Sequence, residues 1–257
     1  MTTQLRKSQF KEKPNSLSQI DETCWTIYTP FRMKGISLGN RMTIFKVKDF
    51  LVLINGVELS PIILKIIKKL EIDSKCKVKY LFSPGDWHHL FLKSWVECKK
   101  VPNLRVIVPK GRIQKVNHEL KCELFEQGSD TYNDFSSELA IISFQGLSQP
   151  FSSKDRNELY FYHKTSRTLV TGDTIVKYYA DTPPLLDRLF LSAHVDEFAW
   201  NPTGKNMIKN IKKAKKSVEE ILDLDIKVVI PPHGEPGGVC LEWAKEKLRM
   251  KFESVLK

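Results

Sequence analysis

The sequence predicts an α/β (α+β) fold in which two β-rich sheets are covered by helices on their outer faces. Strand-like segments dominate the start and middle of the chain, and helical segments fall between them and at the end. The composition agrees, because 41% of the 257 residues are hydrophobic, which is enough to bury a substantial core. From Trp25 onward no linker, repeat or low-complexity tract interrupts the chain, which indicates one continuous domain.

The first half of the chain alternates predicted strands and helices. Residues 41–47 and 50–56 are β-branched, apolar runs separated by a short charged turn, which is typical of a hairpin. Residues 60–71 start with a serine that can cap a helix and a proline suited to the first helical position. A strand, a helix and a second strand are predicted at 78–84, 89–98 and 104–109.

The second half contains four more strand candidates and two helices. The strands are predicted at 138–144, 158–163, 167–173 and 226–232. Residues 205–224 form the clearest helix, and a last amphipathic helix is predicted from about Val239 to the C-terminus. One face of the 205–224 helix carries Lys205, Lys209, Lys212, Lys213 and Lys216. The other carries Ile208, Ile211, Ala214, Val218 and Ile221.

The polar segment 1–21 is predicted to be a flexible N-terminal arm ahead of a domain spanning 22–257. It has no apolar stretch typical of a secretory signal, and no part of the chain approaches 18 consecutive apolar residues. The five cysteines are odd in number and show no CxxC spacing, which favours reduced thiols over a disulfide framework. We therefore expect a cytoplasmic protein without a membrane span.

The formal net charge of +11 favours an anionic partner, which can be a small anionic substrate such as a phosphate ester, nucleic acid or an acidic membrane surface. A lysine-rich surface that serves only solubility is the alternative. The lysines of the 205–224 helix do not by themselves favour nucleic acid, because lysines opposite an apolar face are typical of a solvated helix.

Three predicted strands end in residues suited to metal binding. Asp86, His88 and His89 follow the strand 78–84, and side chains this close together in a loop can share one divalent metal. Asp173 follows an apolar strand and Gly172, which permits a tight turn. His233 lies between two prolines and a glycine at the end of another apolar strand, which fixes its backbone. His163, within a strand, is expected to face the sheet.

These strand-end motifs resemble the metallo-β-lactamase superfamily, and they occur in the order found there. The corresponding segments are VLINGV (52–57), PGDWHH (84–89), TGDT (171–174) and IPPHGEP (230–236). The resemblance covers roughly residues 25–240 and implies a four-layer αββα sandwich. The last two motifs match closely and the first two poorly, as in divergent branches with an HHLF-like cluster.

The first cluster departs from the superfamily's HxHxDH motif. When the last His of the motif is laid on His89, Pro84 and Asp86 take the first two His positions and His88 takes the Asp position. A slip of one residue places His88 last instead. A further His is expected within 144–150, which contains none. The resemblance thus implies that one of two metals has lost its ligands. The ligands implied for the other metal are His88 or Asp86, with His89, Asp173 and His233.

The resemblance implies a metal-dependent hydrolase with a reduced, one-metal site. In this superfamily two metals position a hydroxide that attacks an ester, amide, thioester or phosphoester, and a single metal with an open position can do the same. Zn²⁺ is the first expectation, with Fe and Mn as alternatives, and the substrate is expected to be an anionic ester, phosphoester or thioester. Asp86 is expected to coordinate or orient the water, and His194 to protonate the leaving group.

Two other functions stay open at this point. The loss of histidines is also compatible with a decayed site that binds no metal, in a protein that serves only as a binding module. The net charge is compatible with a member of the fold that processes nucleic acid.

Overall fold

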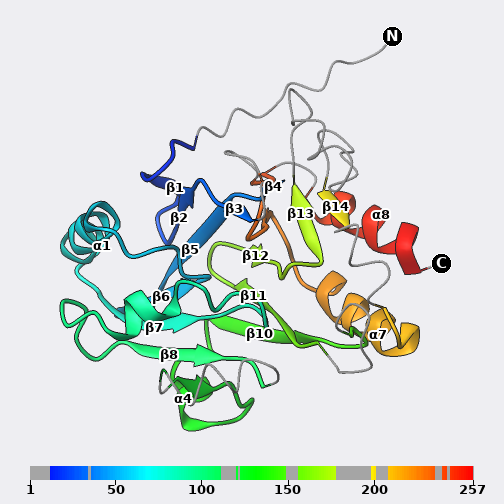
Figure 1. Ribbon diagram of the computed structural model, residues 1–257. Coiled ribbons are helices and arrows are strands. Elements are labelled where there is room, and N and C mark those ends of the chain that lie inside the picture. Colours follow the sequence, from blue (N-terminus) through cyan, green and yellow to red (C-terminus); the bar gives the residue numbers. More distant parts are fainter. Residues whose placement is uncertain are drawn as a thin grey trace.

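The computed structural model describes residues 12–33, 36–110, 120, 122–148, 156–177, 198–200, 208–234, 239–241 and 244–256. Two sheets form the inner layers, and helices cover their outer faces (Figure 1). Helix α1 (Pro61–Ser74) lies on one side of the molecule, and α7 (Ile211–Leu222) and α8 (Ala244–Leu256) lie on the opposite side. This is the αββα order predicted from the sequence. None of the helices in the described part of the chain is long and apolar enough to cross a membrane.

The first sheet has seven strands in the order β1-β2-β5-β6-β7-β8-β9. Its strands up to β6 pair antiparallel, and those from β6 to β9 pair parallel. Their bounds are β1 (Leu17–Asp21), β2 (Cys24–Thr29), β5 (Asn40–Val47), β6 (Phe50–Ile54), β7 (Lys77–Phe82), β8 (Arg105–Val108) and β9 (Glu123–Leu124). The predicted hairpin is therefore β5–β6, and the parallel step from β6 to β7 is made through α1, as parallel strands require.

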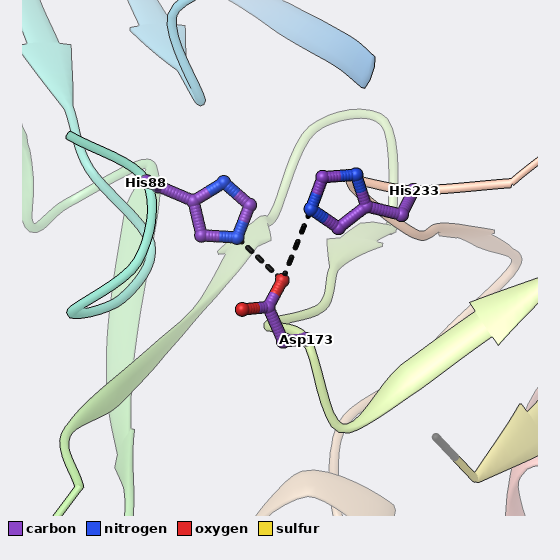
Figure 2. A group of neighbouring side chains, drawn as sticks. All are labelled: His88, Asp173 and His233. Atoms are coloured by element: carbon purple, nitrogen blue, oxygen red, sulfur yellow. Dashed lines mark hydrogen bonds and ion pairs between the residues drawn. The ribbon is translucent and has the colours of Figure 1, made fainter. Parts of the chain in front are cut away.

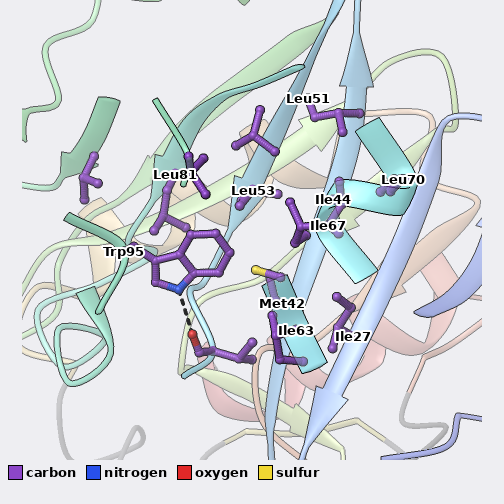
Figure 3. Close-up of a cluster of buried hydrophobic side chains, with 14 of the residues drawn as sticks. Ile27, Met42, Ile44, Leu51, Leu53, Ile63, Ile67, Leu70, Leu81 and Trp95 are labelled. Carbon is purple, nitrogen blue, oxygen red and sulfur yellow. Dashed lines mark hydrogen bonds between the residues drawn. The ribbon is translucent and has the colours of Figure 1, made fainter. Parts of the chain in front are cut away.

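Helices α1 and α2 (Leu92–Val96) cover the outer face of this sheet. Ser60 caps α1 by accepting a hydrogen bond from the backbone N–H of Ile63, and Pro61 is the first helical residue. The apolar side of α1 packs on alternate residues of the strands, and Trp95 of α2 donates its Nε1–H to the carbonyl of Val57 at 2.7 Å (Figure 3). The predicted helix 89–98 is thus confirmed over its central turn.

The second sheet has four strands in the order β10-β11-β12-β15. The first three pair antiparallel, and β12 and β15 pair parallel. The bounds are β10 (Leu139–Phe144), β11 (Glu158–His163), β12 (Thr168–Val170) and β15 (Val228–Ile230). Two short pairs, β3 (Arg32–Met33) with β4 (Ile36–Ser37) and β13 (Ile175–Lys177) with β14 (Phe198–Trp200), and the helix α4 (Asp130–Phe135) complete the described elements.

Strict alternation along the central strands separates the layers. Phe161 and Leu159 of β11 face the first sheet, where they join an inner core shared by both sheets. Tyr160 and Tyr162 face the other way, toward α7 and α8. Because every second side chain of a strand points to the same face, one sequence supplies both the inner core and the outer one.

Two expectations differ from the structure. Residues 12–21 are not a flexible arm: Leu17–Asp21 forms β1, which pairs with β2 at the edge of the first sheet. The predicted helix 205–224 begins at Ile211 in the structure, and Ile211 is 44% exposed because it lies in the first turn and not on the apolar face. The remaining apolar positions of this helix, Ala214, Val218 and Ile221, are buried as expected.

Glu12 and Arg41 form a fully buried ion pair between the N-terminal segment and β5. The Arg41 guanidinium donates to both carboxylate oxygens of Glu12 at 2.8–3.1 Å, and Thr26 donates a further hydrogen bond to Glu12. Arg41 also donates to the carbonyl of Pro231 at 2.8 Å. The pair therefore supports the loop that carries His233.

We expect Glu12→Ala to lower the free energy of unfolding by about 3–5 kcal/mol, because it leaves the Arg41 charge buried without its carboxylate. Urea denaturation of the wild type and the variant measures this difference. Glu22→Ala is the matched control, because Glu22 is exposed, and it is expected to stay within about 0.5 kcal/mol. Equal stability of the Glu12 and Glu22 variants would contradict a structural role for the ion pair.

Candidate metal centre

Three loops that follow strands meet at one edge of the two sheets. The loop after β7 carries His88, the turn after β12 carries Asp173, and the turn after β15 carries His233. Strands β12 and β15 are parallel neighbours, so their carboxyl ends lie side by side. The three side chains lie close enough that one potential ligand atom from each falls within 4.8 Å of the others.

Both imidazole rings point a nitrogen at the same oxygen of Asp173 (Figure 2). The Nε2 atom of His88 lies 2.5 Å from Asp173 Oδ1, and the Nε2 atom of His233 lies 3.4 Å from it. The two rings are stacked, with centroids 5.0 Å apart and an interplanar angle of 20°. His88 and Asp173 are buried, and His233 is partly exposed. The group is thus reached from solvent on the His233 side.

Asn55 fixes the orientation of His88. Its side-chain oxygen lies 2.7 Å from His88 Nδ1, while its amide nitrogen donates to Asn40 Oδ1 and to the carbonyl of Arg41. Because both amide hydrogens are used in this way, the Asn55 oxygen is the acceptor and His88 Nδ1–H the donor. Asn55 has a φ of 63°, a left-handed conformation that asparagine tolerates well. The other ring nitrogen, Nε2, therefore faces Asp173.

A backbone carbonyl fixes His233 in the same sense. The Nδ1–H of His233 donates to the carbonyl of Gly39 at 2.7 Å, which leaves the Nε2 lone pair facing Asp173. The backbone of Gly234 donates to Leu38, so this turn is tied to the segment before β5. A Cβ atom on Gly39 would lie 2.1 Å from the carbonyl of Gly234, and only glycine fits at this approach.

The donor set fits a divalent metal ion. Two imidazole nitrogens and one carboxylate oxygen converge, and imidazoles oriented by an outer hydrogen bond are usual protein ligands of zinc, which bind once they have lost the proton on the ligating nitrogen. Ligand atoms around a tetrahedral zinc lie about 3.3 Å apart. The distance from His233 Nε2 to Asp173 Oδ1, 3.4 Å, is already close to this value. The distance from His88 Nε2 to Asp173 Oδ1, 2.5 Å, needs to widen by roughly 0.8 Å. Three protein ligands leave a fourth position open, as catalytic zinc sites require.

The electrostatics keep Asp173 and His233 in the forms that bind a metal. Burial raises the pKa of Asp173, but the attractions of His88, His233 and Arg156 outweigh burial and hold that pKa well below its ordinary value. Burial lowers the pKa of His233 to about 4, and the nearby charge of His88 adds to this effect while Asp173 opposes it. Asp173 is therefore ionised and His233 neutral at pH 7.

The other oxygen of Asp173 belongs to a buried ion-pair network. Arg156 Nη2 lies 2.8 Å from Asp173 Oδ2 and 2.5 Å from Glu158 Oε1. The Arg156 guanidinium also stacks on the ring of Trp87, with 4.1 Å between its central carbon and the ring centroid. Glu158 accepts from the backbone N–H and hydroxyl of Thr174, so the turn after β12 is anchored to β11.

The fold has many solved counterparts. The metallo-β-lactamase FIM-1 from Pseudomonas aeruginosa, in its mono-zinc form, matches with a TM-score of 0.62 and 12% identity over 96% of this chain and 98% of that one. The metallo-β-lactamase from Pontibacter korlensis matches with a TM-score of 0.55 and 14% identity over 94% and 98%. The chain has the metallo-β-lactamase fold. The enzyme from Hirschia baltica gives a TM-score of 0.55 and 16% identity over 95% and 98%.

At identities this low the likeness shows the metallo-β-lactamase fold and not a shared activity. No protein-family model matches the sequence, and no curated protein matches it significantly. The residues of the centre therefore have to be assigned from this chain's own geometry.

The structure brings together three of the four residues predicted as metal ligands in the metallo-β-lactamase-like motifs: His88, Asp173 and His233. Among the described residues, His89 is not part of this group, and its Nδ1 lies 3.1 Å from the carbonyl of Asp86. The geometry thus favours the register of the cluster in which His88 takes the last position of the motif.

Of the two residues predicted to act in catalysis, the structure describes only Asp86, which is not in the group of three. The Asp86 side chain is buried, and its Oδ2 accepts a 3.4 Å hydrogen bond from the backbone of Asn157. His194 lies outside the described residues. Their predicted roles stay predictions.

Asn55, Arg156 and Glu158 were not singled out from the sequence. Asn55 lies at the end of a strand, in the segment VLINGV that resembles the superfamily's first motif. This position is the feature of the sequence from which a role at the site could have been predicted. Arg156 and Glu158 lie 17 and 15 residues before Asp173, and no local pattern connects them to it. Glu158 explains why a glycine stands at position 172 in the TGD motif, because a Cβ atom there would lie 2.5 Å from Glu158 Oε2.

His163 is confirmed as a strand residue within the sheet and is not part of the centre. It is fully buried and stacks on Phe45, with ring centroids 4.7 Å apart. Its Nε2–H donates to the carbonyl of Lys46, and its Nδ1 lies 2.8 Å from the hydroxyl of Ser166. Burial lowers its pKa.

We expect Asn55→Gly to weaken metal binding about 10–100-fold, because it removes the acceptor that orients His88. Glycine tolerates the positive φ of this position, so the change adds no backbone strain. Competition of zinc with a chromophoric chelator measures the dissociation constant. Asn55→Asp keeps an acceptor oxygen for His88 but sets its other oxygen against Asn40 Oδ1 and the carbonyl of Arg41, so its affinity is expected to lie between those of the wild type and Asn55→Gly. Equal affinity in all three proteins would show that Asn55 does not support the ligand.

We expect the wild type to lose stability as the pH falls below about 6.5, with a contribution from His163. The folded chain holds this ring neutral, whereas the unfolded chain protonates it, so the unfolded state binds more protons and acid favours unfolding. His163→Gln removes this contribution. Unfolding free energies of the metal-free proteins at pH 7.5 and pH 5 should therefore fall less in the variant than in the wild type. The same decrease in both would rule out this contribution.

Proposed function

We propose that this protein is a metal-dependent hydrolase with a one-metal centre formed by His88, Asp173 and His233. One observation carries the proposal: two imidazoles, each with its Nδ1 fixed by an oxygen acceptor, direct their Nε2 atoms at the same oxygen of an ionised carboxylate. A proton on His88 can bridge to Asp173 when no metal is bound, and a divalent ion that displaces this proton would be met by all three donor atoms at once. Convergence of two imidazoles on one carboxylate oxygen is typical of a metal site.

Each residue of the centre has a definite role in this proposal. A bound divalent ion supplies Lewis-acid chemistry, since it acidifies water toward a pKa of about 7 and polarises a carbonyl or phosphoryl oxygen. His88 and His233 bind through Nε2, and Asp173 binds through Oδ1. Asn55 and the carbonyl of Gly39 hold the rings in place. The partly exposed His233 marks the side from which a substrate approaches.

Zinc is the metal we propose first. The donor set of two imidazoles and one carboxylate suits zinc, with iron and manganese as alternatives. The mono-zinc form of FIM-1, one of the proteins of similar fold, supports a single ion as a workable state of this fold.

We propose a small anionic ester, phosphoester or thioester as the substrate. The net charge of +11 supports an anionic substrate. Nucleic acid is less favoured, because Lys212, Lys213 and Lys216 are exposed on α7, in the outer helix layer, where they form a solvated face. A steep fall of binding with salt would argue for nucleic acid after all.

We expect purified wild-type protein to contain about one metal ion per chain, by elemental mass spectrometry after preparation without chelators or nickel resin. His88→Ala, Asp173→Ala and His233→Ala are each expected to lose it. His89→Ala is the matched control, because it changes the neighbouring histidine in the same loop and is expected to retain the metal. Metal in the wild type and loss in these three variants alone would support the centre.

Hydrolysis is tested on the same proteins with a panel of phosphoesters, thioesters and lactones. Turnover by the wild type and the His89 variant, and none by the other three, is the expected result. A metal-free wild type, even after reloading with zinc, manganese or iron, would refute the metal centre and leave a binding module. Bound metal without turnover on the panel would count against a hydrolase.

A further inference from the structure

The carboxylate of Asp173 is divided between two kinds of partner. Its Oδ1 faces the two imidazoles, and its Oδ2 accepts a hydrogen bond from Arg156 at 2.8 Å. A carboxylate that bridges two metal ions presents its oxygens in a comparable way, since ions in two-metal sites lie about 3.5–4 Å apart. On one side of Asp173 the chain thus offers metal ligands, and on the other side it already holds a positive charge.

Contacts with neighbouring side chains fix the position of the Arg156 side chain. The side chains of Arg156 and Glu158 are at most 1% exposed, and Arg156 Nη2 lies 2.5 Å from Glu158 Oε1. The guanidinium lies against the ring of Trp87, the residue directly before His88. It is held on three sides by Asp173, Glu158 and Trp87. A guanidinium keeps its charge under all ordinary conditions, so this is a permanent cation.

We propose that Arg156 takes the place of a second metal ion and limits the centre to one metal per chain. The inference rests on the proposed one-metal centre. Arg156 is a positioning residue in it: it occupies Asp173 Oδ2, so only Oδ1 is presented to the metal, and through Trp87 it steadies the loop that carries His88.

The charges around the site agree with this assignment. Asp86, Glu158 and Asp173 all act on Arg156. Burial raises the pKa of Glu158, so the three carboxylates together with Arg156 leave at most two negative charges, when all are ionised. One divalent ion balances these charges. A second divalent ion beside Arg156 would add two uncompensated positive charges to a buried site, which is strongly unfavourable. Without Arg156, the same carboxylates would attract a second cation.

The test counts manganese ions bound per chain in the wild type and in Arg156→Ala. Manganese is chosen because carboxylate oxygens suit it and because its electron paramagnetic resonance spectrum distinguishes isolated ions from neighbouring pairs. We expect one ion and an isolated-ion spectrum for the wild type, and two ions with a coupled spectrum for Arg156→Ala. Arg156→Gln, which removes the charge but keeps polar contacts, should behave like Arg156→Ala.

Two controls separate the charge from general damage. Arg156→Lys restores a positive charge and is expected to return the count to one. Arg105→Ala removes an arginine that pairs with Glu123 elsewhere in the first sheet, and it is expected to keep one ion. If Arg156→Ala or Arg156→Gln is unfolded without metal, millimolar manganese should restore its folded circular dichroism spectrum, because the second ion replaces the guanidinium.

The outcomes distinguish this inference from the proposed function. Two ions in the wild type would overturn the role of Arg156 and leave the metal centre standing. One ion in folded Arg156→Ala, or failure of manganese to refold it, would also overturn the inference alone. No ion in the wild type would overturn both, since the proposed centre would then be absent.

Discussion

The packing of two sheets through one apolar layer is the constraint on which the rest of the molecule depends. Alternate residues of β6, β7 and β11 meet in this layer, and their neighbours face the outer helices. Because the strand ends of both sheets come together at one edge, loops far apart in sequence can share a site there. His88 comes from the first sheet, and Asp173 and His233 come from the second. The centre therefore exists only when both sheets are formed and correctly packed.

Buried charge at this edge is balanced by a chain of polar contacts. Asp173 is shared between two histidines and Arg156, while Glu158 connects Arg156 to the backbone after β12. Behind His233, Arg41 joins Glu12 to the carbonyl of Pro231. Burying so many polar groups is unfavourable unless their partners are in place, so the edge is stable only as a complete network. Polar networks of this kind favour a single arrangement of the side chains over many similar ones.

Much of the fold follows from local patterns in the sequence. Ser60 and Pro61 predict the start of α1, and the apolar, aromatic run at 158–163 predicts the strand β11. The Asp173 and His233 turns were predicted because glycine and proline fix the backbone at strand ends. The choice between His88 and His89 could not be made this way, since it depends on how the loop turns relative to Asn55 and Asp173. Arg156 could not be predicted either, because its contacts are made across the sheets and not along the chain. For the same reason, the short segment of β1 was assigned to a flexible arm: its pairing with β2 gives no strong local signal.

The guanidinium on Asp173 differs from a metal ion in one respect that matters to the cell. A metal ion exchanges with its surroundings, so a site that needs two ions responds to scarcity at both positions. Arg156 is part of the polypeptide, and its charge is present as soon as the chain has folded. In the proposed one-metal centre, a chelator or a shortage of metal would therefore act on one position alone, and the arrangement of Asp173 and Glu158 around the arginine would persist through it. With the proposed role of Arg156, the centre gives up the adjustable strength of a second ion and depends on the supply of one ion only.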